Sequence, residues 1–418
     1  MSLRWAGLGL LLLGAPLVAQ TARPPSPGPD LGPITALVEK GDLTTAEERL
    51  RRILAQGGGA VARDLLGVVL VRQNRLEEAE KEFRQAIAAD PASLDARQHL
   101  ARLCLSQKRD ADAAAELRRA ARQGPLDRDL GLELARIERA DGHPVAAEQQ
   151  LRSVADRFRS VRALLELARL QSAQKQSASA LESLRRARAI APSSEEVLRA
   201  SAEASLAAGA ALPALRHLEA LVRMYPTVAR YRYLEGTALL LAGDAAAAVS
   251  PLKEAERLEP GQALTLKALG RALAGRQLYA EAKEPLLRAL SLAPDDTETL
   301  SALAEAEEGL GELAGAEAHA LRALAGAGPP AAARLVLGMV RMKQERYAEA
   351  RDALLAASAA DPASAKAHYQ LGLVYARMND PLRAQEHVAQ YRLRKEEAER
   401  RVAEVRALTG FSEGGMRP

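Results

Sequence analysis

The chain has 418 residues, of which 48% are hydrophobic, 27% charged and 3% aromatic, and its formal net charge is +4. A single compact core rarely extends over this length, so several domains or a repeat array are expected. The near balance of 58 basic and 54 acidic residues argues against a nucleic-acid partner, because such proteins concentrate basic charge on one element. The single cysteine, Cys104, excludes an internal disulfide.

The first nineteen residues have the pattern of a secretory signal peptide. Met1–Arg4 carry positive charge, Trp5–Leu13 are apolar, and small residues lead to a cleavage site after Ala19. The apolar stretch is shorter than the roughly 20 residues that span a bilayer comfortably. We therefore expect a cleaved signal peptide at 1–19 and a periplasmic or secreted protein, with an uncleaved membrane anchor as the alternative. A proline-rich linker is predicted at 20–30.

A small residue recurs through the rest of the chain at steps of 34 residues, with a single step of 33. Its positions are Gly67, Ala101, Ala135, Ala168, Ala202, Gly236, Gly270, Ala304, Gly338 and Gly372. An alanine follows each of them after twelve residues, and in most repeats a leucine follows four residues later. Alanine, leucine, glutamate and arginine dominate the composition, and these are helix formers. The two series predict helix–turn–helix units that bury their apolar faces by stacking.

This pattern resembles the tetratricopeptide-repeat (TPR) family over most of the chain. The resemblance implies an all-α, right-handed α-solenoid of about ten 34-residue repeats, here over 31–380. Residues 31–57 fit only a leading half-repeat with a truncated first helix. At the other end, 381–408 are expected to form a C-terminal capping helix. Its later part is nearly all charged, which suits a solvent-facing lid on the last repeat, and 409–418 are expected to be a disordered tail.

The sequence offers no constellation of catalytic residues, so we expect no enzyme activity and no cofactor. No two of the six histidines have the i, i+4 spacing of a helical zinc site, and no cysteine pair completes one. Phosphate-binding loops and nucleophile elbows are also missing from the sequence. Cys104 is expected to be a small buried hydrophobic residue rather than a nucleophile.

The family resemblance implies that the second, fifth, ninth and twelfth positions of each repeat face a concave groove. The ninth position carries arginine in three successive repeats, at Arg102, Arg136 and Arg169. Further basic or aromatic residues fall at groove positions, namely Arg139, Arg162, Arg199, Arg230, Tyr233, Lys267 and Arg271. Towards the C-terminus the groove positions become apolar, at Leu335, Met339, Met342, Tyr369 and Leu373.

These residues support two hypotheses about binding. The arginines would bind an acidic protein segment or an anionic glycan through guanidinium–carboxylate pairs, and the apolar end would bind an apolar peptide or helix. Alternatively, the arginines pair with acidic neighbours such as Glu133 and Glu166, and Met339 and Met342 simply fill the core.

The leading functional hypothesis is a non-enzymatic scaffold in the cell envelope that binds an unidentified protein partner in the groove. The alternative is a binding module for an anionic ligand, such as an acidic polysaccharide in envelope assembly or export. The lysine–asparagine clamp of TPR domains that hold chaperone C-termini is absent. The only asparagines are Asn74 and Asn379, both in predicted turns. The sequence predicts no particular oligomeric state.

Overall fold

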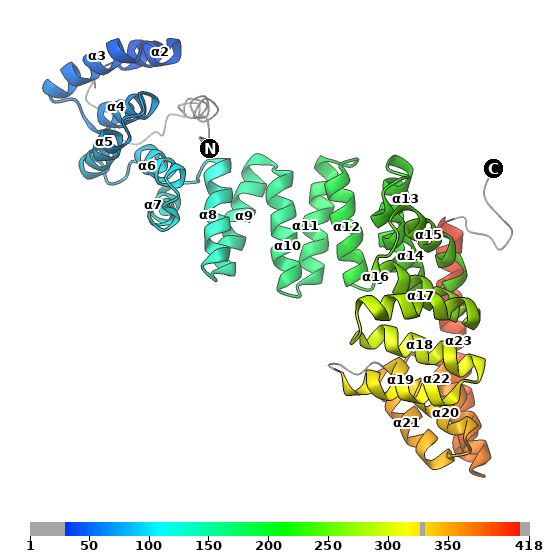
Figure 1. The fold of residues 1–418 in the computed structure, drawn as a ribbon. Helices are drawn as coiled ribbons and strands as arrows, with labels where there is room; N and C mark the ends of the chain where they lie inside the picture. The colour runs from blue at the N-terminus through cyan, green and yellow to red at the C-terminus, as the bar shows by residue number, and fades with distance from the viewer. Residues whose placement is uncertain (1–29, 327–330, 410–418) are drawn as a thin grey trace. The chain divides into compact units, whose positions relative to one another are not determined.

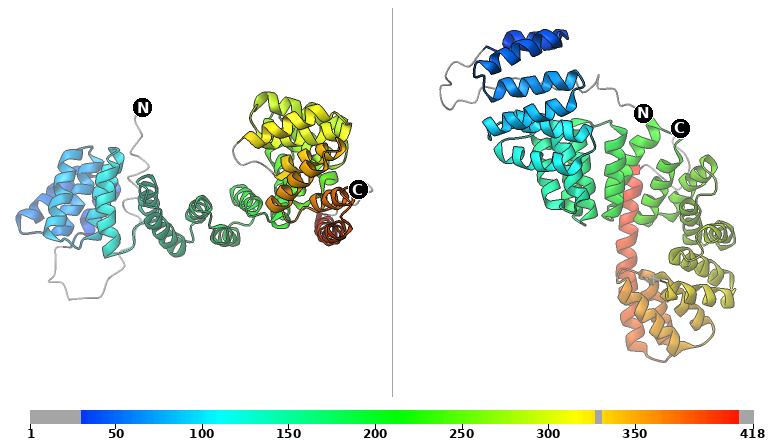
Figure 2. Two further views of the ribbon diagram at one scale, coloured as in Figure 1. Left: turned by 90° about the horizontal axis from the view of Figure 1, so that it is seen from below. Right: turned by 60° about the vertical axis from the view of Figure 1, so that its left-hand side comes forward.

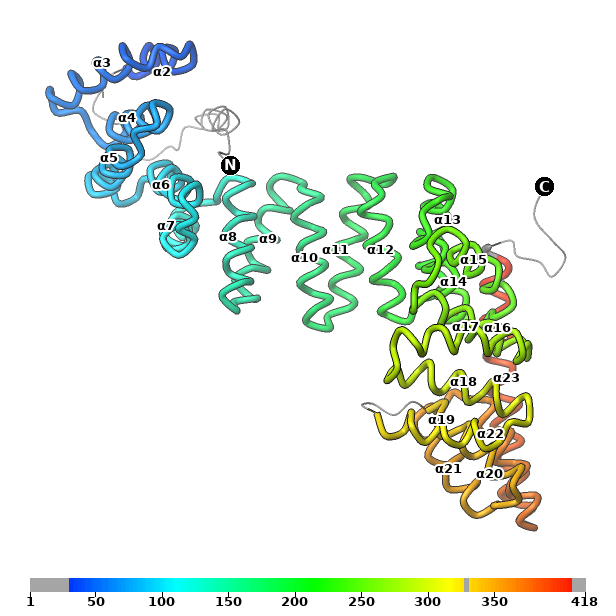
Figure 3. Tube along the Cα trace, in the orientation of Figure 1, coloured from blue at the N-terminus to red at the C-terminus, as the bar shows by residue number. Residues whose placement is uncertain are grey.

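The structure, a computed structural model, describes residues 30–326 and 331–409. The predicted signal peptide at 1–19 and nearly all of the linker and tail therefore lie outside the described residues. Within those ranges every element is an α-helix, and there are twenty-two of them without any strand. The prediction of an all-α solenoid of repeated helix pairs is confirmed. Figure 3 lets the reader follow the chain from pair to pair.

The chain divides into two compact units, residues 1–174 and 175–418 (Figure 1). The helices of the first unit are α2 (Gly32–Lys40), α3 (Leu43–Ala55), α4 (Ala60–Arg72), α5 (Leu76–Ala89), α6 (Leu94–Ser106), α7 (Asp110–Gln123), α8 (Arg128–Ala140), α9 (Pro144–Phe158) and α10 (Val161–Ala173). Those of the second unit are α11 (Ser177–Ile190), α12 (Glu195–Ala207), α13 (Ala211–Met224), α14 (Ala229–Ala242), α15 (Ala245–Leu258), α16 (Ala263–Gly275), α17 (Tyr279–Leu292), α18 (Thr297–Leu310), α19 (Leu313–Ala325), α20 (Ala331–Lys343), α21 (Tyr347–Ala360), α22 (Ala365–Arg377) and α23 (Pro381–Thr409).

The ten predicted repeats begin in register with the small-residue series. In each, the first helix starts seven residues before the small residue, as α16 does at Ala263 before Gly270. The turn between the two helices places one residue at positive φ in all ten repeats. Glycine or asparagine occupies six of these positions, including Gly243 (φ 89°) and Asn74 (φ 63°). Lys108, Lys175, Gln277 and Glu345 adopt the same conformation, so the packing of the pair imposes the turn even on residues that disfavour it.

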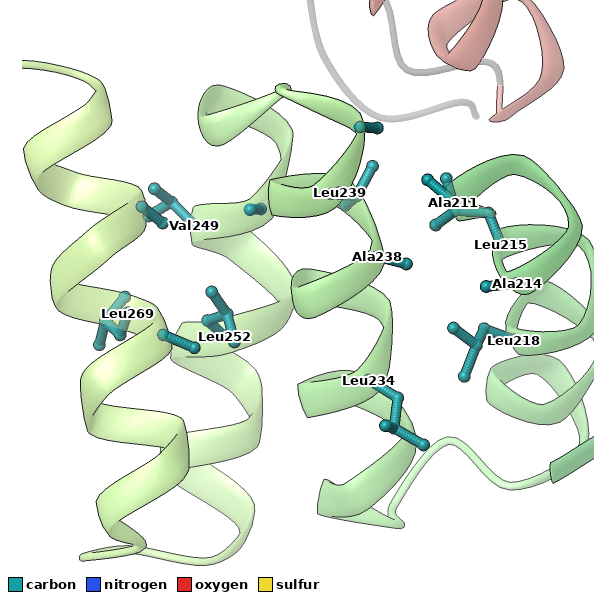
Figure 4. Close-up of a cluster of buried hydrophobic side chains, with 14 of the residues drawn as sticks. Ala211, Ala214, Leu215, Leu218, Leu234, Ala238, Leu239, Val249, Leu252 and Leu269 are labelled. Carbon is teal, nitrogen blue, oxygen red and sulfur yellow. The ribbon is translucent and has the colours of Figure 1, made fainter. Parts of the chain in front are cut away.

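In the repeats whose small residue is glycine, the pair is held by a close approach between that glycine and a bulky side chain sixteen residues later. A methyl group placed on Gly270 would lie 2.3 Å from Cγ of Leu286, and one on Gly67 would lie 2.5 Å from Cε1 of Phe83. The same proximity joins Gly236 to Leu252. Leu252 and Leu286 are fully buried in a cluster that extends from α12 to α18 (Figure 4). The leucine or phenylalanine side chain therefore fills the space that a side chain on the glycine would need.

The first helices form the inner face of the second unit. Each of α12, α14, α16, α18 and α20 contacts the first helix of the next repeat, whereas successive second helices make less contact with one another. An array of pairs bends towards the layer whose members lie closer together, so the even-numbered helices line the concave side. An ion pair between Lys366 of α22 and Glu305 of α18, two repeats apart, spans this side at 2.6 Å.

The two ends of the array differ. At the start, the nine-residue α2 is a short first helix, as expected for 31–57, and it buries Ile34 and Val38 and pairs with α3. At the C-terminus, α23 ends at Thr409, one residue beyond the expected 408. The end of α23 does not fit the expected solvent-facing lid on the last repeat, because Val405 is completely buried and α23 also contacts α13 and α14 (Figure 2). No helix in the described ranges has the length and apolar character needed to cross a membrane.

The close approach at Gly270 predicts a strong response to added volume there. Replacing Gly270 with Val should lower the free energy of unfolding by about 1–3 kcal/mol, because the new side chain has no space beside Leu286. Thermal unfolding followed by circular dichroism measures the loss. Arg271→Val places the same side chain at the adjacent exposed position and should cost less. Equal losses in the two variants would contradict this packing.

Candidate functional site

The five arginines predicted in the groove of the first unit lie on its first helices. Arg102 is on α6, Arg136 and Arg139 are on α8, and Arg162 and Arg169 are on α10. Arg102 is mostly buried and pairs with Asp127, the residue that precedes α8. The other four are exposed, so they are accessible to a ligand.

Carboxylates of the same or a neighbouring helix contact three of these four exposed arginines. Arg136 pairs with Glu133 and with Asp110, each at 2.7 Å, and these bonds raise the pKa of its guanidinium, the bond to Asp110 most. Glu166 forms ion pairs with Arg169 at 2.6 Å and with Arg139 at 3.1 Å. The alternative in which the arginines pair with Glu133 and Glu166 therefore describes their contacts. Glu166 therefore joins two cations, one on its own helix and one on α8.

The basic residues in the second unit follow the same arrangement. Glu203 of α12 pairs with Arg230 of α14 at 2.8 Å and lies 3.7 Å from Arg199 of its own helix. Glu298 of α18 pairs with Lys267 at 3.0 Å and lies 3.9 Å from Arg271. One carboxylate again joins two cations, in each case across adjacent first helices.

Lys267 and Tyr233 are only partly exposed. Burial lowers the pKa of Lys267, but the hydrogen bonds and negative charge of Glu298 and Asp296 outweigh it and hold the pKa above its ordinary value. Tyr233 is partly buried against the core cluster of α14 and its neighbours. Both residues therefore contribute to packing between repeats.

The apolar residues near the C-terminus divide into buried and exposed members. Met339 is only 6% exposed, while Leu335 and Met342 are partly buried against the cluster of α21 and α22. Tyr369 and Leu373 lie one turn apart on α22 and are 43% and 38% exposed. Of the apolar residues predicted for the groove, these two present the most surface to a partner.

A recurring clamp at the turn between paired helices was missed by sequence reasoning. Arg109 pairs with Glu80 on the second helix of the preceding repeat, with Asp112 on its own helix, and with the amide oxygen of Gln107. The same set of contacts recurs around Arg75 and Arg346. The signal in the sequence is Gln-x-Arg-x-x-acid, which begins at 73, 107 and 344, the same point of three repeats. These arginines fix neighbouring repeats to one another.

The remaining chemistry-bearing side chains of the described ranges include Cys104 and a histidine pair. Cys104 is buried, as expected, and burial raises the pKa of its thiol. His368 and His387 approach across α22 and α23, with their Nδ1 atoms 3.1 Å apart, and burial lowers the pKa of each ring. Among the residues with described side chains, no three histidine, cysteine or carboxylate residues gather as metal ligands.

Comparison with known families agrees with the repeat geometry. The profile described as "Tetratricopeptide repeat" matches residues 34–89, 65–128 and 132–195, and the profile described as "TPR repeat" matches 338–379. The chain is a tetratricopeptide-repeat protein. Tetratricopeptide repeats in general act as scaffolds for protein–protein interaction.

Solved structures with this architecture are similar to parts of this TPR chain. A tetratricopeptide repeat protein from Parabacteroides merdae is 17% identical, with a TM-score of 0.49, and the match covers 59% of this chain and 98% of the other. MamA is 22% identical with a TM-score of 0.30, and the match covers 40% of this chain and 96% of MamA. No curated protein matches the chain. At these scores the two structures carry no argument about ligands.

The clamp predicts a specific acid sensitivity. The hydrogen bond from Arg109, the largest cause, lowers the pKa of Glu80 to about 2 from an ordinary value of 4.5. The folded-state pKa is lower than the unfolded one, so the stabilisation is complete above about pH 4.5 and disappears as the pH falls towards 2. The unfolding midpoint of Glu80→Gln should therefore fall less between pH 4.5 and pH 2 than that of the unmodified chain.

Unfolding midpoints measured at intervals between pH 5 and pH 2 test this expectation. Glu77→Gln changes an exposed carboxylate on the same helix and serves as the matched control. The account of the clamp fails if Glu80→Gln and Glu77→Gln follow the same acid profile.

Proposed function

We propose that this TPR protein is a non-enzymatic scaffold of the cell envelope that binds an apolar segment of a partner protein on the inner face of α20 and α22. The observation that carries the proposal is the exposure of Tyr369 and Leu373 on a first helix. Side chains one turn apart on a helix form a continuous patch. Exposed apolar surface at a concave face is typical of a site that receives a peptide or helix.

The surroundings of this patch suit a protein segment. Leu335 and Met342 extend it towards α20, where they are partly buried. Tyr391 of α23 lies against Tyr369 with ring centroids 5.2 Å apart, so the exposed ring is held in place. The ion pair between Lys366 and Glu305 adds a polar edge that can orient a bound backbone. Together these residues supply an apolar centre with a polar margin.

The anionic-ligand alternative has weaker support. A glycan carboxylate would compete with Glu166, Glu203 or Glu298, each of which already joins two cations. Replacing an existing ion pair by one with the ligand gains little net free energy, because surface pairs contribute only about 0–1 kcal/mol. The arginines therefore support an anionic ligand less strongly than the apolar patch supports a protein segment.

Charge placed in the patch should abolish partner binding. We expect Tyr369→Glu combined with Leu373→Glu to reduce capture of the partner at least tenfold, because carboxylates would have to be buried in an apolar contact. The measurement is crosslinking of the full-length chain in native envelope, followed by quantitative mass spectrometry against the unmodified protein.

Two further variants separate the alternatives. Leu287→Glu with Leu355→Glu changes exposed leucines on second helices and should leave capture intact. Arg136→Glu with Arg169→Glu should also retain the partner. Loss of the partner in the arginine variant, with retention in the patch variant, would contradict the proposed face and favour the arginine stripe.

The envelope location rests on residues 1–19 and has its own test. If the signal peptide is cleaved after Ala19, the protein isolated from its native source should begin at Gln20. N-terminal sequencing of the fractionated protein reads this directly. A chain that retains Met1 and fractionates with the soluble interior would rule out the proposed location.

A further inference from the structure

The last turns of α23 contact a surface far away in the sequence. They lie against α13 and α14 (Figure 2) and approach the turn that follows α14. A Cβ built on Gly243 in this turn would lie 3.5 Å from Cγ2 of Val402. We call Gly243, Asp244 and the adjoining ends of α13 and α14 the socket. It lies on different helices from the Tyr369–Leu373 patch.

The polar part of the socket is a buried carboxylate. The side chain of Asp244 is only 1% exposed, and its Oδ2 accepts a hydrogen bond of 2.7 Å from Nε of Arg406. Its Oδ1 accepts a second bond from Arg406 at 3.3 Å and one from the backbone N–H of Ala247, which caps α15. Burial raises the pKa of Asp244, but these hydrogen bonds outweigh it and hold the pKa below its ordinary value. A buried carboxylate in this position requires a cationic partner.

The apolar part of the contact is small. Val405 is completely buried and belongs to the core cluster of α13 and α14, part of which is drawn in Figure 4. Val402 lies three residues earlier on the same side of the helix and is partly buried. Between Lys395 and Arg401 six of the seven residues are charged. Such a connecting stretch is readily hydrated, so the end of α23 can leave the socket without exposing a large apolar surface.

We propose that the socket binds an amphipathic helix of a partner protein that carries two aliphatic residues three apart, followed directly by an arginine. The end of α23 has this pattern at Val402, Val405 and Arg406, and it occupies the socket in cis. A partner helix therefore competes with α23, which has the advantage of being tethered to the same chain. Asp244 selects helices with the arginine, because a helix without it would leave the buried carboxylate charge without compensation.

The test uses a fluorescein-labelled synthetic peptide of residues 395–409 and the full-length chain. Val405→Asp in the chain should free the socket, so this variant should bind the peptide at least tenfold more tightly than the unmodified chain does. Adding Asp244→Asn to the opened chain should remove that gain, while asparagine preserves the cap of α15. A peptide carrying Arg406→Ala should bind the opened chain at least tenfold more weakly. One carrying Arg400→Ala, an exposed position, should bind normally.

Folding of each variant is checked by circular dichroism, and Arg406→Glu opens the socket by charge alone if Val405→Asp does not fold. Equal peptide binding to the opened and unmodified chains, or binding to neither, would overturn the proposal. Sedimentation of the unmodified chain as a dimer that Val405→Asp dissociates would overturn it too, because the occupant would then be α23 of a second copy.

Discussion

The approach of a small residue to a large side chain sixteen positions later determines the geometry of every repeat that carries it. Gly270 and Leu286 show the contact in its tightest form. Because the two helices must come this close, the turn between them is forced into positive φ, and Gln277 accepts that conformation although glutamine disfavours it. Repetition at a constant period then stacks the pairs, so the local contact produces the extended array.

Stacking gives each unit two chemically different faces, and in the second unit the first helices line the concave one. On this face the ion pairs hold neighbouring repeats together, as Glu298 does with Lys267, and at α22 the apolar side chains of Tyr369 and Leu373 stay exposed. The residues proposed to bind a partner and the residues that join repeats therefore occupy equivalent positions of different repeats. A scaffold built in this way can change its partner by changing a few side chains while its packing stays constant.

The periodic spacing was sufficient to predict the repeats, because the small and large residues that pack together lie close to one another in the sequence. The first helices start seven residues before the small residue, in the register of the series that includes Gly270. Pairing of Arg139 with Glu166 remained one of two alternatives, since the partner of a long side chain depends on rotamers and on the helix beside it. The contact between Arg406 and Asp244 could not be predicted, because it joins residues 162 positions apart outside the period. For the same reason the charged end of α23 suggested only a solvated lid.

The central claim is that a partner protein reaches the concave face at α22. A photo-crosslinking amino acid placed at position 373, and in a separate sample at position 287 on the second helix α17, tests it within the native envelope. The account predicts a defined partner crosslinked from position 373 and none from position 287. Equal crosslinking from both positions, or a partner captured only from 287, would contradict it.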